Sequence, residues 1–308
     1  MNGAFQIVVL GCSGGPRENN ISGYLISPLS TQQWVILDAG SLLGGIDIAL
    51  AKDNLQNVPF TDPESTQACE MLVKHIKGYL LSHAHLDHIS GLVLNSQVDS
   101  KKYILGIDST IDNLRDHIFN GKIWPNYGNE GNEPIINLYQ YVRLPLHQEQ
   151  QIPDTEMTVE AYLLSHPDKY PSTAFLIEHK GRYLLYFGDT SSDYLEGEKH
   201  LERIWHRITP LLKKGSLHGI MLECSFPHED AEQVIYGHLD SHLMIRELHH
   251  LAEIAGTSLK GLNVLITHRK ECLKKGRDAH LKIQEELTAL NDLGVTLHFP
   301  QQGDRFTF

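Results

Sequence analysis

The sequence has few cysteines, no excess of basic charge and no long apolar run, and each of these absences excludes a class of protein. Its four cysteines, Cys12, Cys69, Cys224 and Cys272, lie far apart without a CxxC pair, so neither a disulfide scaffold nor a thiolate zinc knuckle is indicated. Lysine and arginine total 26 against 38 acidic residues, a formal charge of −12, which disfavours long nucleic acids as partners. No apolar stretch reaches the roughly 18 residues that cross a bilayer. We therefore expect a protein of the reducing cytoplasm that engages neither a membrane nor a long nucleic acid.

Short apolar runs that end in a polar or glycine turn recur along the chain. They predict buried strands over residues 5–11, 34–40, 78–85, 183–190, 219–225 and 263–268. A helical spacing of apolar residues lies between them, for example over 241–256, where Ser241 is the expected N-cap and Gly256 the expected stop. Strands that alternate with helices indicate an α/β layered fold.

The chain is expected to form a single domain, 1–308, with two similar halves. The stretch WVILDAGS resembles YLLYFGDTS, and KGYLLSHAH resembles KGLNVLITHRK, so that each half has one strand ending at an aspartate and one ending at a histidine. Two such halves facing each other would bring all four strand ends to one edge. The stretch from about 120 to 158 is rich in Gly, Asn and Pro, and it predicts a long loop or lid.

Nineteen histidines are present, and their most informative grouping is SHAHLDHISGL, residues 82–92. Residues 83 and 85 of a regular strand would point to the same face, so His83 and His85 can face one point. Asp87 and His88 then open an expected helix, whose first-turn N–H groups favour anions. Imidazole and carboxylate are ligands for zinc, with manganese or iron(II) as alternatives. Because four ligands from six residues do not close on one tetrahedral ion, two divalent ions are the simpler arrangement.

Further ligands are available where other apolar runs end. His166 in LLSHP, Asp189 in FGDT and His268 in LITHR each follow a strand-like segment. A single polar residue at a strand end is usually a cap or a hydrogen-bonding group. Together with HxHxDH, these three residues instead indicate a metal site.

The order of these residues resembles the metallo-β-lactamase superfamily, and HAHLDHISGLVLNS (83–96) resembles the signature of class II 3′,5′-cyclic-nucleotide phosphodiesterases. The resemblance implies an αββα sandwich with the metals at the edge between its two sheets. It assigns His83, His85 and His166 to one ion and Asp87, His88 and His268 to the other, with Asp189 as the bridge. It also implies that Asp38 orients a ligand histidine from behind.

The resemblance implies hydrolysis of 3′,5′-cyclic nucleotides (cAMP, cGMP or both) to nucleoside 5′-monophosphates by a metal-bridging hydroxide. Asp87 would bind metal and position the hydroxide. His238 in YGHLDSHL is the expected general acid or phosphate contact, with His242 as the competing choice. Glu223 resembles an acidic residue of the RNA-processing relatives, and a structural hydrogen bond is an equal interpretation.

Base recognition and several alternatives stay open. Trp124 and Tyr127 in WPNYG could stack a purine or could anchor their own loop. A tRNA 3′-processing endonuclease or another hydrolase of the same fold would share the ligand set, and a non-catalytic metal-binding module is a further alternative. The sequence does not decide between adenine and guanine, and it is compatible with a homodimer.

Overall fold

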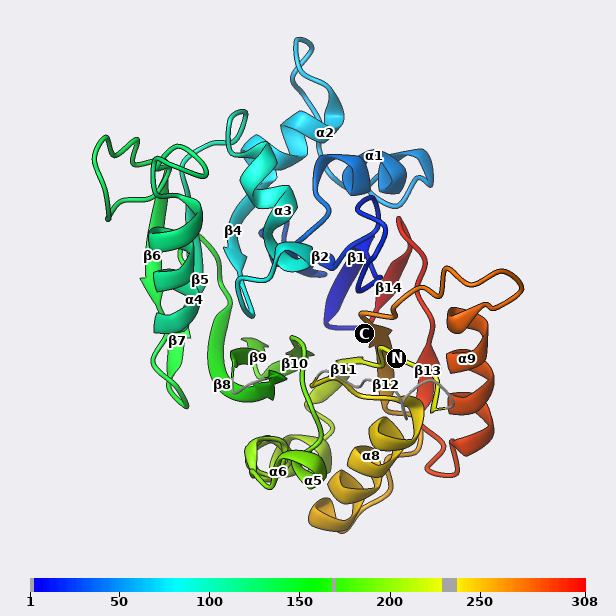
Figure 1. The fold of residues 1–308 in the computed structure, drawn as a ribbon. Helices are drawn as coiled ribbons and strands as arrows, with labels where there is room; N and C mark the ends of the chain where they lie inside the picture. Colours follow the sequence, from blue (N-terminus) through cyan, green and yellow to red (C-terminus); the bar gives the residue numbers. More distant parts are fainter. Residues whose placement is uncertain (1–2, 168–169, 229–236) are drawn as a thin grey trace.

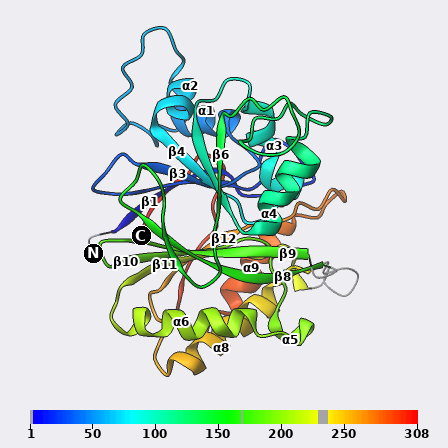
Figure 2. The ribbon, with the colours of Figure 1, turned by 90° about the vertical axis from the view of Figure 1, so that its left-hand side faces the viewer.

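Two seven-stranded sheets lie face to face, and helices cover the outer side of each. This arrangement is clear in two perpendicular views of the computed structural model (Figure 1, Figure 2). The structure describes residues 3–167, 170–228 and 237–308. The four layers form the αββα sandwich that the sequence analysis expected.

The first sheet is built mainly from the N-terminal half of the chain. Its order is β14-β1-β2-β3-β4-β5-β6. The run β1-β2-β3 is antiparallel, and β4, β5 and β6 then continue parallel to β3. The strands span Phe5–Gly11 (β1), Gly23–Pro28 (β2), Trp34–Ala39 (β3), Ile76–Leu80 (β4), Lys102–Gly106 (β5), Tyr139–Arg143 (β6) and Arg305–Thr307 (β14).

The second sheet repeats this sequence of directions. Its order is β13-β12-β11-β10-β9-β8-β7. The run β8-β9-β10 is antiparallel, and β11, β12 and β13 continue parallel to β10. The carboxyl ends of β8, β10, β11 and β12 therefore lie at one edge. The strands span Glu149–Gln151 (β7), Thr158–His166 (β8), Tyr170–His179 (β9), Arg182–Phe187 (β10), Leu217–Glu223 (β11), Asn263–Thr267 (β12) and Thr296–His298 (β13).

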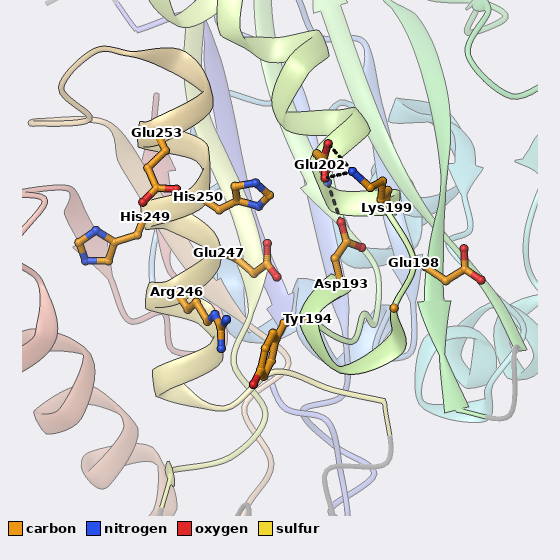
Figure 3. A pocket seen from close by; sticks show the side chains of 11 residues that line it. Asp193, Tyr194, Glu198, Lys199, Glu202, Arg246, Glu247, His249, His250 and Glu253 are labelled. Carbon is orange, nitrogen blue, oxygen red and sulfur yellow. Dashed lines mark hydrogen bonds and ion pairs between the residues drawn. The ribbon is translucent and has the colours of Figure 1, made fainter.

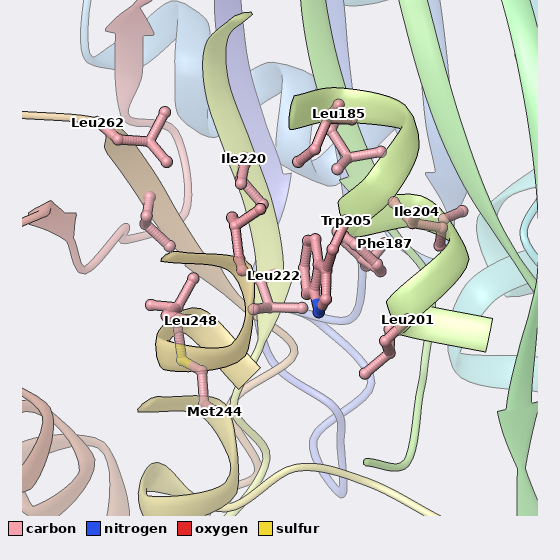
Figure 4. Close-up of a cluster of buried hydrophobic side chains, with 14 of the residues drawn as sticks. Leu185, Phe187, Leu201, Ile204, Trp205, Ile220, Leu222, Met244, Leu248 and Leu262 are labelled. Atoms are coloured by element: carbon pink, nitrogen blue, oxygen red, sulfur yellow. The ribbon is translucent and has the colours of Figure 1, made fainter. Parts of the chain in front are cut away.

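Three clusters of buried apolar side chains hold the four layers together. One lies between the sheets and includes Phe5 and Ile177. A second joins the first sheet to the helices on its outer face. The third joins the second sheet to α6 and α8, where Trp205 packs on Phe187 with ring centroids 5.4 Å apart (Figure 4).

The helices span Leu43–Ala51 (α1), Gln67–Glu70 (α2), Leu86–Asn95 (α3), Asp108–Asn113 (α4), Asp193–Glu196 (α5), His200–Lys213 (α6), Ser241–Ala255 (α8) and Ala279–Leu290 (α9), and Met71–His75 (η1) and Leu114–Ile118 (η2) are π-helical.

Helix α8 begins one residue earlier than its predicted cap, Ser241, implies. The N-cap is Asp240, whose side chain accepts a hydrogen bond from Leu243 N at 2.7 Å, and Ser241 is the first helical residue. A carboxylate caps a helix as well as a hydroxyl does, so the LDSH sequence offered two candidates. Gly256 ends the helix in the left-handed conformation, as predicted.

The predicted loop over about 120–158 is wrong for part of its length. It contains β6, which pairs in parallel with β5, and β7, which pairs with β8. Both strands are the outermost members of their sheets. Both are partly exposed and lack the continuous buried apolar run on which the predicted strands rested.

Of the two pairs of similar sequence segments, only one occupies equivalent strand positions in the two sheets. Strand β3 is third in its run and β10 is third in the other, whereas β4 is fourth and β12 is fifth. Any parallel strand of a run delivers its carboxyl end to the same edge, so a difference of one position does not separate the side chains. Among the described residues, no helix is long and apolar enough to cross a membrane.

Candidate metal centre

The polar cluster forms where the carboxyl ends of strands from both sheets meet. Asp38 lies in β3, and His83 follows β4; from the other sheet, His166 ends β8, Asp189 follows β10 and His268 follows β12. Asp38 (φ +51°) and His268 (φ +52°) both have left-handed backbone conformations. Residues other than glycine adopt this conformation at a cost, and such strain is concentrated at functional sites.

The HxHxDH segment is a strand, a turn and a helix start in immediate succession. Strand β4 stops at Leu80, and His85 is the extended N-cap residue of α3, which begins at Leu86. The turn over 81–85 brings His83 and His85 to the same side, with ring centroids 4.5 Å apart. Asp87 lies in the first helical turn, where the helix dipole favours a carboxylate.

Asp189 is the centre of the cluster. Its carboxylate is buried, and each oxygen faces several imidazole nitrogens. Oδ1 lies 3.2 Å from His88 Nε2 and 3.3 Å from His268 Nε2. Oδ2 lies 3.6 Å from His166 Nε2 and 3.8 Å from His83 Nε2. The position between the two sets of histidines is the one a bridging carboxylate requires.

The seven residues that the sequence analysis assigned to metal gather into two groups that share Asp189. Within each group the candidate ligand atoms all lie within 4.8 Å of one another. The groups are His83, His85, His166 and Asp189, and Asp87, His88, Asp189 and His268.

Three buried atoms in the cluster show that divalent cations fit these residues. His83 Nε2, His88 Nε2 and Asp189 Oδ1 have no hydrogen-bond partner among the described residues. A buried polar atom without a partner is costly. All three atoms face the shared space, and they are of the donor types that bind divalent metals. The cluster on this fold therefore fits a dinuclear metal site.

The imidazole nitrogens that face away from the cluster are held by outer partners. His88 Nδ1 donates to Asp38 Oδ2 at 2.8 Å, and His166 Nδ1 donates to Gly237 O at 2.9 Å. Asp38 also accepts from Tyr186 Oη at 2.6 Å. Such outer hydrogen bonds set the tautomer and the orientation of a ligand histidine.

Burial and charge shift the pKa values of His83, His166 and Asp87 toward the forms that bind metal. For His88, by contrast, burial would lower the pKa, but the carboxylates of Asp189, Asp38 and Asp87 outweigh burial and raise it. Burial lowers the pKa of His166 to about 4 and lowers that of His83. Burial alone would raise the pKa of Asp87, but the nearby His88 and His268 outweigh burial and lower it. Neutral imidazoles and ionised carboxylates are the forms that bind cations.

His238 and Glu223 lie beside the cluster as a hydrogen-bonded pair. His238 Nδ1 donates to Glu223 Oε1 at 2.9 Å, and its ring lies 4.8 Å from that of His166 and 5.1 Å from that of His268. Burial would lower the pKa of His238, but the carboxylates of Glu223 and Asp189 outweigh burial and raise it. The two carboxylates thus favour the protonated form of His238 at the border of the candidate metal site.

The competing choice, His242, lies elsewhere. It stacks on His228, with ring centroids 3.7 Å apart and an angle of 10°. The structure therefore brings His238, and not His242, to the cluster. The two are four residues apart, and the start of α8 between them turns His242 away.

Trp124 and Tyr127 do not join the site. Trp124 Nε1 donates to Ser96 Oγ at 2.9 Å, and Ser96 is the C-cap of α3. The metal-facing residues lie at the other end of that helix, which spans roughly 15 Å at 1.5 Å per residue. Tyr127 packs against Phe119. The aromatic rings anchor their own loop, so the prediction that they stack a base has no structural support.

Three contacts escaped the sequence analysis. His85 stacks on Tyr170 with ring centroids 4.5 Å apart and an angle of 16°. His83 Nδ1 meets Ser82 Oγ, and His268 Nδ1 meets Ser225 Oγ. A serine next to a ligand histidine in SHAH was visible in the sequence. Nothing in the sequence indicated that Ser225 pairs with a histidine 43 residues later.

A separate pocket of about 550 Å³ lies between α5, α6 and α8, on the outer side of the second sheet (Figure 3). It is lined by several acidic side chains and by Arg246, whose guanidinium lies 3.4 Å from the ring centroid of Tyr194. Its buried Glu247 already accepts hydrogen bonds from Ser192 and Trp205. None of the seven candidate metal ligands lines this pocket.

The four-layer sandwich and its two-part histidine and aspartate cluster define a protein of the metallo-β-lactamase fold. A metallo-β-lactamase fold protein from Bacillus subtilis shares the architecture, with a TM-score of 0.62 and 18% identity over 98% of this chain and 99% of the other. Yeast PDE1 superposes with a TM-score of 0.83 and 26% identity over 99% of this chain and 100% of the other.

Within this fold, the family model of class-II cAMP phosphodiesterases matches residues 5–303. A relative from Aliivibrio fischeri, named 3′,5′-cyclic-nucleotide phosphodiesterase, is 37% identical over 309 aligned residues, which cover 100% of this chain and 94% of the relative. The chain belongs to the class II cAMP phosphodiesterase family and is a phosphodiesterase, as the resemblance of HAHLDHISGLVLNS (83–96) indicated.

Proposed function

We propose that the protein hydrolyses 3′,5′-cyclic nucleotides, cAMP, cGMP or both, to nucleoside 5′-monophosphates. The observation that carries the proposal is the pair of ligand groups sharing Asp189, with His238 held beside them by Glu223. The names of relatives such as the A. fischeri protein support the substrate class.

We propose that two divalent ions occupy the cluster, one held by His83, His85 and His166, the other by Asp87, His88 and His268. The five histidines favour zinc, and manganese or iron(II) are the competing metals. When bound, such ions would supply Lewis acidity and lower the pKa of water to about 7, which would provide a nucleophile at neutral pH.

The protein's own groups then have separable roles. The attack of water on phosphorus breaks the bond between phosphorus and O3′, and the departing O3′ needs a proton. His238 supplies it as the general acid, because Glu223 holds its Nδ1 and orients the ring. Asp87, the most exposed candidate carboxylate ligand with 28% of its side chain accessible, orients the attacking water.

The net charge of the protein favours a small substrate, and its free cysteines favour a reducing compartment. The formal charge of −12 opposes a tRNA substrate, which a processing endonuclease of this fold would need to bind. The four cysteines are free thiols, which supports a cytoplasmic location. The mass of the purified protein in solution would distinguish a monomer from a homodimer.

The test is release of 5′-AMP from 3′,5′-cyclic AMP by zinc-loaded protein, with cyclic GMP, bis(p-nitrophenyl) phosphate and a pre-tRNA as parallel substrates. We expect rapid turnover of a cyclic nucleotide that is lost on chelation and restored by metal. Cleavage of only the generic diester or the RNA would reject the substrate while retaining the metal centre.

A further inference from the structure

Each candidate metal group contains one histidine whose outer nitrogen meets a buried serine. His83 Nδ1 lies 3.0 Å from Ser82 Oγ, and His268 Nδ1 lies 2.9 Å from Ser225 Oγ. The other nitrogen of each ring, Nε2, faces Asp189. One serine thus lies behind each of the two ligand groups.

The direction of these hydrogen bonds follows from the next partner outward. Ser82 Oγ donates to Asp38 Oδ2 at 2.7 Å, and Ser225 Oγ donates to Glu223 Oε2 at 2.6 Å. An ionised carboxylate only accepts, and a hydroxyl has a single proton to give. Each serine must therefore accept from Nδ1–H of its histidine, and Nε2 is the ring nitrogen that faces the cluster.

The surroundings leave no substitute for either hydroxyl. Ser82, Ser225, Asp38 and Glu223 are each 0% or almost 0% exposed, so solvent does not reach them. The backbone of Gly188 passes directly over Ser82, and a Cβ at Gly188 would lie 2.6 Å from Ser82 Oγ. Loss of the hydroxyl would leave a buried ring N–H without an acceptor.

Glu223 joins this arrangement to His238. Its Oε1 accepts from His238 Nδ1, and its Oε2 accepts from Ser225. The Asp38 side has a parallel branch, because Asp38 accepts both from Ser82 and from His88 Nδ1. Each carboxylate therefore holds two histidines, one directly and one through a serine.

We propose that Ser82 and Ser225 are positioning residues, each of which holds one ligand histidine, His83 or His268, in the Nδ1–H tautomer that binds metal through Nε2. The inference rests on the proposed metal-dependent function and adds a division of labour, with Ser82 acting on the first ion and Ser225 on the second.

The test is metal affinity in Ser82→Ala and Ser225→Ala, measured by competition of zinc-loaded protein against a chelating dye. Outer-partner substitutions typically weaken metal binding 10- to 100-fold, and we expect that loss for one ion of the two in each variant. Ser225→Thr, which keeps the hydroxyl, should restore affinity to within a few-fold. Ser90→Ala is the matched control, because Ser90 lies on the exposed side of α3 and bonds only its own helix.

The assignment of each serine to one ion is checked in an Asp87→Ala background, in which only the first ion remains. There Ser82→Ala should weaken binding and Ser225→Ala should not. Nitrogen-15 NMR of the metal-free wild type reports the tautomer directly and should show Nδ1–H on both His83 and His268.

The outcomes separate this inference from the proposed function. Unchanged affinities in both variants, equal loss of both ions in each variant, or an Nε2–H tautomer would overturn the role of the serines. Fewer than two ions in the wild type would reject the metal centre itself. Two ions with selective loss would support the serines, whatever substrate the enzyme hydrolyses.

Discussion

Glu223 holds His238 through a 2.9 Å hydrogen bond from His238 Nδ1 to Glu223 Oε1, in an environment from which water is almost excluded. The two residues lie on different parts of the second sheet's edge, Glu223 at the end of β11 and His238 just before α8. A buried and oriented imidazole whose pKa is raised by neighbouring carboxylates, next to a candidate metal site, has the properties of a general acid.

Removal of this imidazole should slow turnover without emptying the metal site. We expect His238→Ala to lower kcat by about 10² to 10⁴, with two ions still present by elemental analysis. His242→Ala is the control, because His242 stacks on His228 away from the cluster. An unchanged kcat in His238→Ala would leave that residue a structural role alone.

Asp87 is the carboxylate that belongs to the second ligand group alone. Its Oδ2 lies 3.1 Å from His268 Nε2. Asp87→Ala should abolish turnover and reduce the metal content from two ions to one, because the second group loses an anionic ligand. Asp292→Ala removes an exposed carboxylate that pairs with His249 and should change neither quantity. Full activity of Asp87→Ala with two ions bound would contradict the assignment.

Gly14 lies against the ring of His268 so closely that any side chain would displace it. A Cβ at Gly14 would lie 2.6 Å from His268 Nδ1. We expect Gly14→Ala to weaken binding of the second ion and to lower activity, while the fold by circular dichroism is retained. Gly44→Ala adds a methyl group where there is open space and serves as the control. Equal zinc affinity of Gly14→Ala and the wild type would show that the ring can move without loss.

Lys102 and Asp99 form a buried ion pair far from the candidate site, at the start of β5. Their atoms Nζ and Oδ1 lie 2.5 Å apart, and the hydroxyls of Tyr79 and Tyr139 donate to Asp99 Oδ2. Lys102→Met leaves a buried carboxylate without its cation, and such a loss costs about 3–5 kcal/mol of unfolding free energy. Urea unfolding measures it. The exposed neighbour gives the control: Lys101→Met should change stability by less than about 0.5 kcal/mol, and a similarly small effect in Lys102→Met would refute the prediction.

His298 should make part of the stability depend on pH. Its ring packs between Phe306 and Phe308, its Nε2 donates to Asn263 Oδ1 at 3.1 Å, and burial lowers its pKa. The unfolded chain, with a usual pKa of about 6.5, then binds a proton that the folded protein does not. Stability is therefore lost as pH falls through about 6.5.

The variant His298→Gln keeps a hydrogen-bond donor and removes the titration. In metal-free protein, the loss of unfolding free energy between pH 7.5 and pH 5.5 should be smaller in His298→Gln than in the wild type. His206→Gln, at an exposed position with 64% of the side chain accessible, should keep the wild-type slope. Identical slopes in all three proteins would show that His298 does not contribute.

Local sequence was sufficient for strands β1, β3, β4, β10, β11 and β12, and for naming the candidate ligands, because each rests on short-range signals. The run FQIVVLG predicted β1 with the same bounds, since a buried strand needs only a continuous apolar stretch between turns. The edge strands β6 and β7 were missed because their partly exposed residues carry no such signal. The purpose of Trp124 was equally hidden, since an aromatic side chain in a loop looks the same whether it binds a ligand or packs on Ser96.

By itself, the sequence determined which residues are the candidate metal ligands: HxHxDH after one strand, and His166, Asp189 and His268 where apolar runs stop. Only the tertiary structure decided how they are held. The side-by-side placement of parallel strand ends made Asp189 the centre of five histidines, and it placed Ser225 behind His268. The physical reason is that hydrogen bonds between side chains tens or hundreds of residues apart in sequence depend on how the two sheets pack. No local sequence pattern encodes which of these side chains come close in space.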